Sequence, residues 1–140
     1  MRRLAFTLLE LVVVLSLVGL LMALAVPRFS AMRDSASVRA AMADLGADFS
    51  MARQSAIARR TAVAVVLDTT LGTVVLRSAG RAFSRHTLHA TYGIVLGANR
   101  DSAVYDPRGL GYAVSNLTVT VRRGAIVDTL TMSRMGRVRW

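Results

Sequence analysis

The stretch Leu4–Val26 constrains this chain most, because it is almost uniformly apolar. It reads LAFTLLELVVVLSLVGLLMALAV, and Glu10 is its only charged residue. As a helix, residues 6–26 would span about 31 Å at 1.5 Å per residue, which matches the hydrocarbon core of a bilayer. Arg2 and Arg3 precede the stretch. We therefore predict a membrane-spanning helical half over residues 6–26.

Three interpretations compete for this segment. It is a removable signal peptide with a cleavage site at Ala23–Ala25, a plain signal anchor, or an anchor in which Glu10 has a function. The apolar run 11–26 is longer than a signal peptide usually has, and neither of the first two explains a carboxylate. An ionisable residue in a membrane segment costs about 2.5–3.5 kcal/mol near the centre and is a functional hypothesis by default.

The N-terminus resembles the type IV pilin and type II secretion pseudopilin class. The resemblance lies in the short basic leader 1–5, the run Phe6-Thr7-Leu8-Leu9-Glu10, the apolar stretch that follows and Pro27. It implies cleavage between Ala5 and Phe6 by a prepilin peptidase and N-methylation of Phe6. It also implies that Glu10 neutralises the new amine of a neighbouring subunit during assembly. The class usually has glycine where this chain has Ala5, which predicts slower cleavage.

After Pro27 an amphipathic pattern continues to about residue 60. Apolar residues recur three or four positions apart, as on one face of a helix. This stripe consists of Val38, Met42, Leu45, Phe49, Ala52 and Ala56. We therefore predict one helix whose second half, residues 27–60, packs on a domain.

From Thr61 the pattern changes to strands, so residues 61–140 are predicted to form an antiparallel β-sheet domain. Strands are expected at 63–67 and 73–76 as a hairpin, and at 117–122 and 125–133 as a second pair. Residues 91–96 and 103–105 are expected as short strands, and another is expected after Gly136. Residues 78–85 are expected to be a loop. The predicted class is α+β, with a long helix packed on the sheet domain.

The second half of the chain resembles a narrower group, the GspH/FimT family of minor pseudopilins and minor pilins. The run Tyr105-Asp106-Pro107-Arg108-Gly109 and the later Gly136-Arg137-Val138-Arg139 carry this resemblance. The GspH-like branch implies a position near the tip of a secretion pseudopilus. The FimT-like branch implies DNA capture through the terminal arginines.

The sequence contains little that suggests catalysis. It has no cysteine, and its acidic residues include a single glutamate, so neither a thiol nucleophile nor a glutamate pair is available. His86 and His89 lie three residues apart without a nearby ligand in sequence, which favours solvated surface histidines over a zinc site. We predict a protein that is not an enzyme and that uses no metal or cofactor.

The sequence leaves open whether the basic residues bind an anionic partner. All 18 are arginine, and the formal charge is +10, which makes anionic partners feasible. In an extended strand, Arg137 and Arg139 project to one face, and Val138 and Trp140 to the other. These two arginines could bridge phosphates, and the candidate site also includes Arg134, Arg122 and Arg123. The alternative is that the arginines solvate a sheet edge and discourage edge pairing.

The sequence therefore favours a minor pseudopilin of the H type from a type II secretion system, a structural subunit of a periplasmic filament. Its expected location is the bacterial inner membrane, with the N-terminus cytoplasmic and the C-terminal domain periplasmic. Its expected partners are other pilin or pseudopilin subunits and the prepilin peptidase. The alternatives are a FimT-like minor pilin that binds DNA and an exported soluble β-domain.

Overall fold

A single long helix begins the fold. The computed structural model describes residues 7–112 and 116–140, and α1 spans Leu8–Arg59. The Thr7 hydroxyl accepts a hydrogen bond from the backbone N–H of Glu10 at 3.2 Å, so Thr7 caps the helix N-terminus. The chain divides into two compact units, residues 1–33 and 34–140, which are described separately.

The described part of the first unit is helical and apolar. Its side chains are exposed to the surroundings, among them Leu8, Leu15 and Leu24. An 18-residue window in α1 has a mean hydropathy of 2.7 with none of it buried, so length and composition suit a membrane crossing. The helix continues through Pro27 without interruption.

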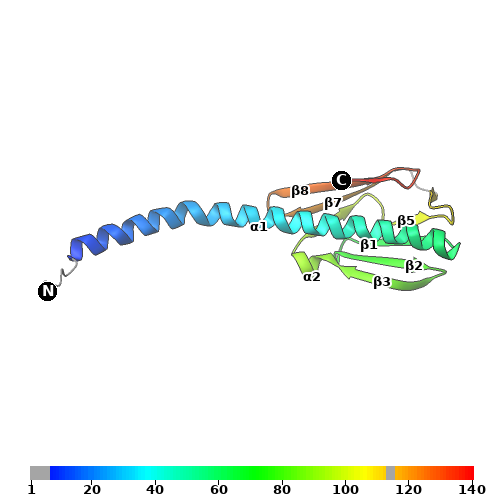
Figure 1. Cartoon of the computed structure of the whole chain (residues 1–140), viewed down its shortest axis with the longest axis horizontal. Coiled ribbons are helices and arrows are strands. Elements are labelled where there is room, and N and C mark those ends of the chain that lie inside the picture. Colours follow the sequence, from blue (N-terminus) through cyan, green and yellow to red (C-terminus); the bar gives the residue numbers. More distant parts are fainter. Residues whose placement is uncertain (1–6, 113–115) are drawn as a thin grey trace. The chain divides into compact units, whose positions relative to one another are not determined.

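In the second unit, α1 covers two antiparallel sheets (Figure 1). The five-stranded sheet has the order β3-β2-β1-β5-β6, and the four-stranded sheet has the order β4-β7-β8-β9. A short helix, α2, spans Leu88–Tyr92. The strands are β1 Val63–Asp68, β2 Thr73–Ser78, β3 Arg81–Thr87, β4 Val95–Ala98, β5 Ser102–Tyr105, β6 Gly111–Tyr112, β7 Leu117–Arg123, β8 Ile126–Met132 and β9 Val138–Arg139.

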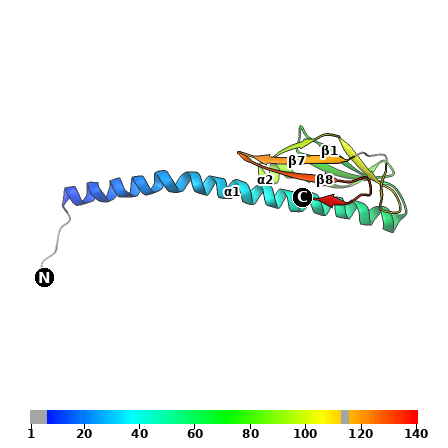
Figure 2. The same ribbon diagram turned by 90° about the horizontal axis from the view of Figure 1, so that it is seen from above.

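The core forms where α1 meets the two sheets (Figure 2). The whole predicted helical stripe, Val38 to Ala56, is buried. Strand β7 buries Leu117, Val119 and Val121 while Thr118 and Thr120 stay partly exposed, as alternation requires. The α+β prediction, with a long helix packed on antiparallel strands, is therefore confirmed.

Two local predictions were wrong. Residues 78–85 are not a loop, because most of them belong to β3, which pairs with β2 from Thr73↔Thr87 to Ser78↔Arg81. This edge strand is mostly exposed, so it has no apolar alternation to reveal it. Residues 91–96 are not one strand either. The helix α2 ends at Tyr92, Gly93 adopts φ 63° as its left-handed cap, and β4 begins only at Val95.

Candidate functional site

The basic C-terminal strand is positioned by a tight turn after β8. The backbone N–H of Gly136 donates to the Ser133 carbonyl at 2.9 Å, and that of Ser133 donates to the Arg137 carbonyl at 2.8 Å. Gly136 has φ 72°, a left-handed conformation that favours glycine. The turn reverses the chain so that β9 pairs with β8 through Thr131↔Arg139 and Met132↔Val138.

Two motifs that are distant in sequence meet at Gly136. A Cβ placed there would lie 2.9 Å from Cε1 of Tyr105, 3.0 Å from the Gly109 carbonyl oxygen and 3.1 Å from the Gly111 nitrogen. The Tyr105 hydroxyl donates to the Gly136 carbonyl at 3.4 Å. Burial raises the pKa of Tyr105 to about 12, so the phenol stays protonated at neutral pH. Contact between these motifs therefore fixes where β9 starts.

The Asp106 carboxylate stabilises the loop that contains Gly109 and Gly111, which lie next to Gly136. It accepts hydrogen bonds from the backbone N–H groups of Leu110 at 2.8 Å and Arg108 at 2.9 Å. The hydrogen bond from Leu110 contributes most to lowering the pKa of Asp106, and the Arg108 side chain also lowers it. The carboxylate organises the loop internally, as Asp does in many turns.

Arg139 lies on the sheet face opposite the core. It pairs with Thr131 on β8, and Thr131 pairs with Thr118 on β7. The neighbouring row, Val138, Met132 and Leu117, faces inward. Because successive strand residues alternate between faces, a polar row with an arginine at its end forms on the outer face.

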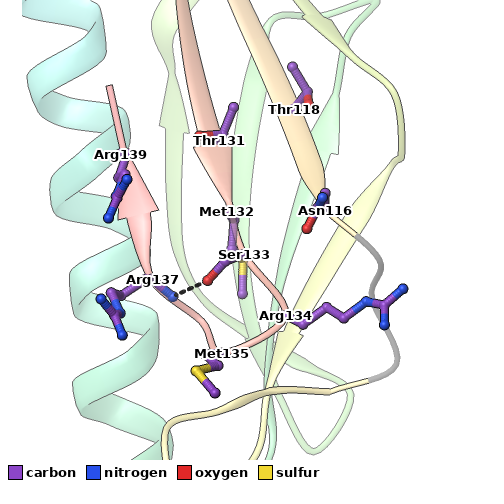
Figure 3. A pocket seen from close by; sticks show the side chains of 9 residues that line it. All are labelled: Asn116, Thr118, Thr131, Met132, Ser133, Arg134, Met135, Arg137 and Arg139. Atoms are coloured by element: carbon purple, nitrogen blue, oxygen red, sulfur yellow. Dashed lines mark hydrogen bonds between the residues drawn. The ribbon is translucent and has the colours of Figure 1, made fainter.

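An open pocket of about 650 Å³ lies on this outer face (Figure 3). None of its lining residues is acidic, and among the described residues none of its three arginines forms a side-chain ion pair. Figure 3 shows Arg137 and Arg139 on the α1 side of the pocket, whereas Arg134 extends away from them. The lining residues are Asn116, Thr118, Thr131, Met132, Ser133, Arg134, Met135, Arg137 and Arg139. Guanidinium groups with hydroxyls and an amide can bind an oxyanion.

The remaining arginines of the predicted site lie elsewhere. Arg122 and Arg123 are at the far end of β7, four and five residues from Thr118, or about 13 and about 17 Å at 3.3 Å per residue. Arg122 is exposed. The Arg123 guanidinium forms an ion pair with Asp34 at 2.9 Å and donates to the Ser37 hydroxyl at 2.9 Å and to the Tyr92 carbonyl. The structure therefore gives Arg123 a role in joining α1, α2 and β7, and it groups only Arg134, Arg137 and Arg139 at the pocket.

The predicted N-terminal site is described only in part. Glu10 is exposed in the first turn of α1, three residues after the capping Thr7. This is the position of the acidic residue in a capping box. Ala5 and Phe6 lie outside the described residues.

The two histidines are exposed, as expected, but each has a partner. A His89 ring nitrogen lies 2.7 Å from the Ile94 carbonyl oxygen. His86 lies 3.3 Å from a carboxylate oxygen of Asp48, whose side chain is only 3% exposed. Burial raises the pKa of Asp48, and His86 partly offsets this effect. The sequence suggested no ligand for these histidines because Asp48 is distant along the chain. Among the described residues, no cluster of three metal-ligating side chains occurs.

Comparison with known proteins identifies the fold. No family model matches the chain, and no curated protein is significantly similar in sequence. Two crystal structures of the type IV minor pilin FimU from Pseudomonas aeruginosa strain PAO1 are similar to it, each with 14% identity. In one, the TM-score is 0.65 over 77% of this chain and 90% of FimU. In the other, it is 0.61 over 72% and 90%. The chain therefore has the pilin-like fold that its N-terminus predicted.

Proposed function

We propose that this protein is a minor pilin-like subunit that acts by assembling into a pilus or pseudopilus filament and not by catalysis. The observation that carries the proposal is the pilin-like fold, in which one helix combines an exposed apolar segment with a stripe buried by two sheets. An exposed apolar surface of this size requires lipid or other protein. The H-type pseudopilin of a type II secretion system remains the first candidate, on the resemblance of its motifs.

The unbroken helix favours this proposal over the exported soluble domain. Cleavage after Ala25 would cut α1 within its continuous run from Leu8 to Arg59. In the proposed pathway, a prepilin peptidase cuts between Ala5 and Phe6, Phe6 is N-methylated and the helix stays in the inner membrane. The C-terminal domain then lies in the periplasm until the subunit enters the filament.

Glu10 provides the test of assembly. In the proposed filament, its carboxylate neutralises the amine of a neighbouring subunit in the apolar layer. Leaving such a charge unpaired costs about 3–5 kcal/mol. Glu10→Ala should therefore insert into the membrane and be cut before Phe6, yet be depleted from sheared filaments. N-terminal sequencing measures the cut, and mass spectrometry of filaments measures incorporation.

Glu10→Gln is the matched control for the capping position. Glutamine suits the third position of a capping box as well as glutamate does, but it carries no charge. If Glu10 acts by charge neutralisation, the Gln variant should be depleted as strongly as the Ala variant. Normal incorporation of Glu10→Gln would assign the residue to helix capping and reject its proposed role in assembly.

A second candidate function is DNA binding by a FimT-like minor pilin, and the acid-free pocket favours it. Arg137 and Arg139 would each contact a phosphate. The test compares Arg137→Ala/Arg139→Ala with Arg81→Ala/Arg85→Ala, two exposed arginines on the edge strand β3 of the other sheet. Both variants lose the same net charge, so a diffuse electrostatic field predicts equal losses of affinity.

Localised binding predicts a different result for the two variants. The first pair should lose far more affinity for a duplex oligonucleotide. Its log–log salt slope should also fall by up to about two units, near 0.9 for each phosphate contact. Equal losses in the two variants would reject the DNA function and leave the secretion pseudopilin as the better candidate.

A further inference from the structure

Gly46 is a glycine in the middle of the α1 segment that packs on the sheets. Glycine inside a helix costs about 0.5–1 kcal/mol relative to alanine, so its presence needs a reason. A Cβ at this position would lie 2.5 Å from Cη2, 2.8 Å from Cζ3 and 3.0 Å from Cζ2 of Trp140. The outer edge of the indole ring therefore rests on bare helix backbone, where only glycine leaves room for it, while Trp140 as a whole stays 61% exposed.

Apart from the contact between Trp140 and Gly46, strand β9 is held mainly by its pairing with β8 and by Val138. It consists of Val138 and Arg139, with one pairing residue on β8 for each. Val138 packs against the core. Figures 1 and 2 both show the end of the chain beside α1. Trp140 follows directly after Arg139, so its contact with Gly46 holds the end of β9 against the helix.

The same contact sets the direction of the arginines. Within β9, Val138 packs against the core and Arg139 lies on the outer face. Arg137 and Trp140 flank the strand: Arg137 lines the pocket, and the edge of the Trp140 ring contacts α1. Rotation of β9 about its axis would turn the two guanidinium groups away from the pocket that they line. A ring seated on Gly46 opposes that rotation.

We propose that Trp140, seated on Gly46, is a positioning residue for the pocket arginines Arg137 and Arg139. This inference rests on the second candidate function, DNA binding at the pocket. In this arrangement the indole does not contact the phosphates. It holds β9 in the orientation in which both guanidinium groups face the phosphate backbone of the bound DNA. The contact between α1 and Trp140 therefore determines how many phosphates are neutralised.

Trp140 is the only tryptophan in the chain, so tryptophan fluorescence reports on its contact with Gly46. The experiment uses the full chain in a zwitterionic detergent and compares Gly46→Ala with Gly19→Ala. Gly19 is a matched control because it lies in the same helix and has nothing within 4 Å of a Cβ. Because Trp140 is already 61% exposed, acrylamide quenching is the sensitive readout, and we expect it to increase in Gly46→Ala only. Unchanged acrylamide quenching in Gly46→Ala would overturn the contact between Trp140 and Gly46.

Binding of a duplex oligonucleotide then tests the positioning role. Gly46→Ala should weaken binding and lower the salt slope toward the values of Arg137→Ala/Arg139→Ala. Adding Gly46→Ala to that double variant should cause no further loss, because the arginines it positions are gone. Trp140→Ala, which removes the ring without adding bulk to the helix, should reproduce both effects.

The outcomes separate this inference from the function on which it rests. If the arginine pair matters but Gly46→Ala and Trp140→Ala bind with unchanged affinity and salt slope, the positioning role is wrong and the DNA function stands. If the arginine pair loses no more than Arg81→Ala/Arg85→Ala, the DNA function fails and this role fails with it. A loss of thermal stability with an unchanged salt slope would make the Trp140 contact merely structural.

Discussion

Gly136→Ala should destabilise the sheet domain more than a positive φ alone explains. A non-glycine residue in the left-handed region costs about 1–2 kcal/mol, and Gly136 has φ 72°. The added Cβ would also meet the Gly109 oxygen at 3.0 Å and the Gly111 nitrogen at 3.1 Å. These are backbone atoms of the loop shaped by Asp106, so they cannot rotate away. Overpacking of this kind typically costs a further 1–3 kcal/mol, roughly.

Gly80→Ala separates the two contributions. Gly80 has φ 78°, and a Cβ there would have nothing within 4 Å, so this variant should show only the conformational cost of about 1–2 kcal/mol. The expected total for Gly136→Ala is about 2–5 kcal/mol. For a domain of this size, each kcal/mol lowers the melting temperature by about 4–8 °C.

The assay is urea and thermal unfolding of the full chain in detergent, followed by Trp140 fluorescence and near-ultraviolet circular dichroism. Both signals come mainly from the sheet domain, because the single tryptophan and all three tyrosines of the chain are in the second unit. Gly136→Ala should unfold at a clearly lower urea concentration than Gly80→Ala. Equal midpoints would refute the argument that contact between the two motifs fixes the start of β9.

Two further predictions concern the packing of α1. Asp48→Asn should be at least as stable as the wild type at pH 7. Burial raises the pKa of Asp48 above its ordinary value, so its contribution to stability is present at low pH and lost as pH rises through the raised pKa. Melting curves should show this difference shrink as the pH falls to 4, and a growing difference would contradict the assignment. Arg123→Ala should cost about 2 kcal/mol in urea unfolding, between the values for exposed and buried ion pairs, because it leaves Asp34 unpaired. The adjacent exposed Arg122→Ala should change stability by under about 0.5 kcal/mol, and equal losses in these two variants would contradict the role of Arg123.

Sequence patterns revealed the elements that have one buried face. The stripe from Val38 to Ala56 and the alternation in β7 each indicate which side of the element faces the core. Both elements were therefore predicted correctly. Strand β3 was missed because an exposed edge strand has no alternation of apolar and polar residues. The cap at Gly93 ended α2 where the sequence predicted a continuous strand.

The site depended on contacts that local patterns do not contain. The terminal arginines were recognisable, and the predicted hairpin already put Arg122 and Arg123 at the turn that follows the strand from Leu117. Alternation alone could not show that β9 pairs with the opposite end of β8, which separates the two groups of arginines. The threonines of the pocket were visible only as the polar half of a two-faced strand. The contacts of Gly136 with Gly109 and of Gly46 with Trp140 join residues far apart in the chain. A glycine in the middle of the amphipathic half of the helix was the one local signal for the latter.

The position of β9 bears on whether its arginines merely protect a sheet edge. Exposed edges need protection in proportion to the length of unpaired backbone they present, and very short edge strands are already poor templates for pairing. Strand β9 has two residues, and Trp140 rests on α1 beside it. Charged side chains that block edge pairing are needed less on β9 than on β3, which is seven residues long and carries Arg81 and Arg85. Edge protection therefore explains the β3 arginines better than those of β9, and the two pairs form a fair comparison in the DNA-binding test.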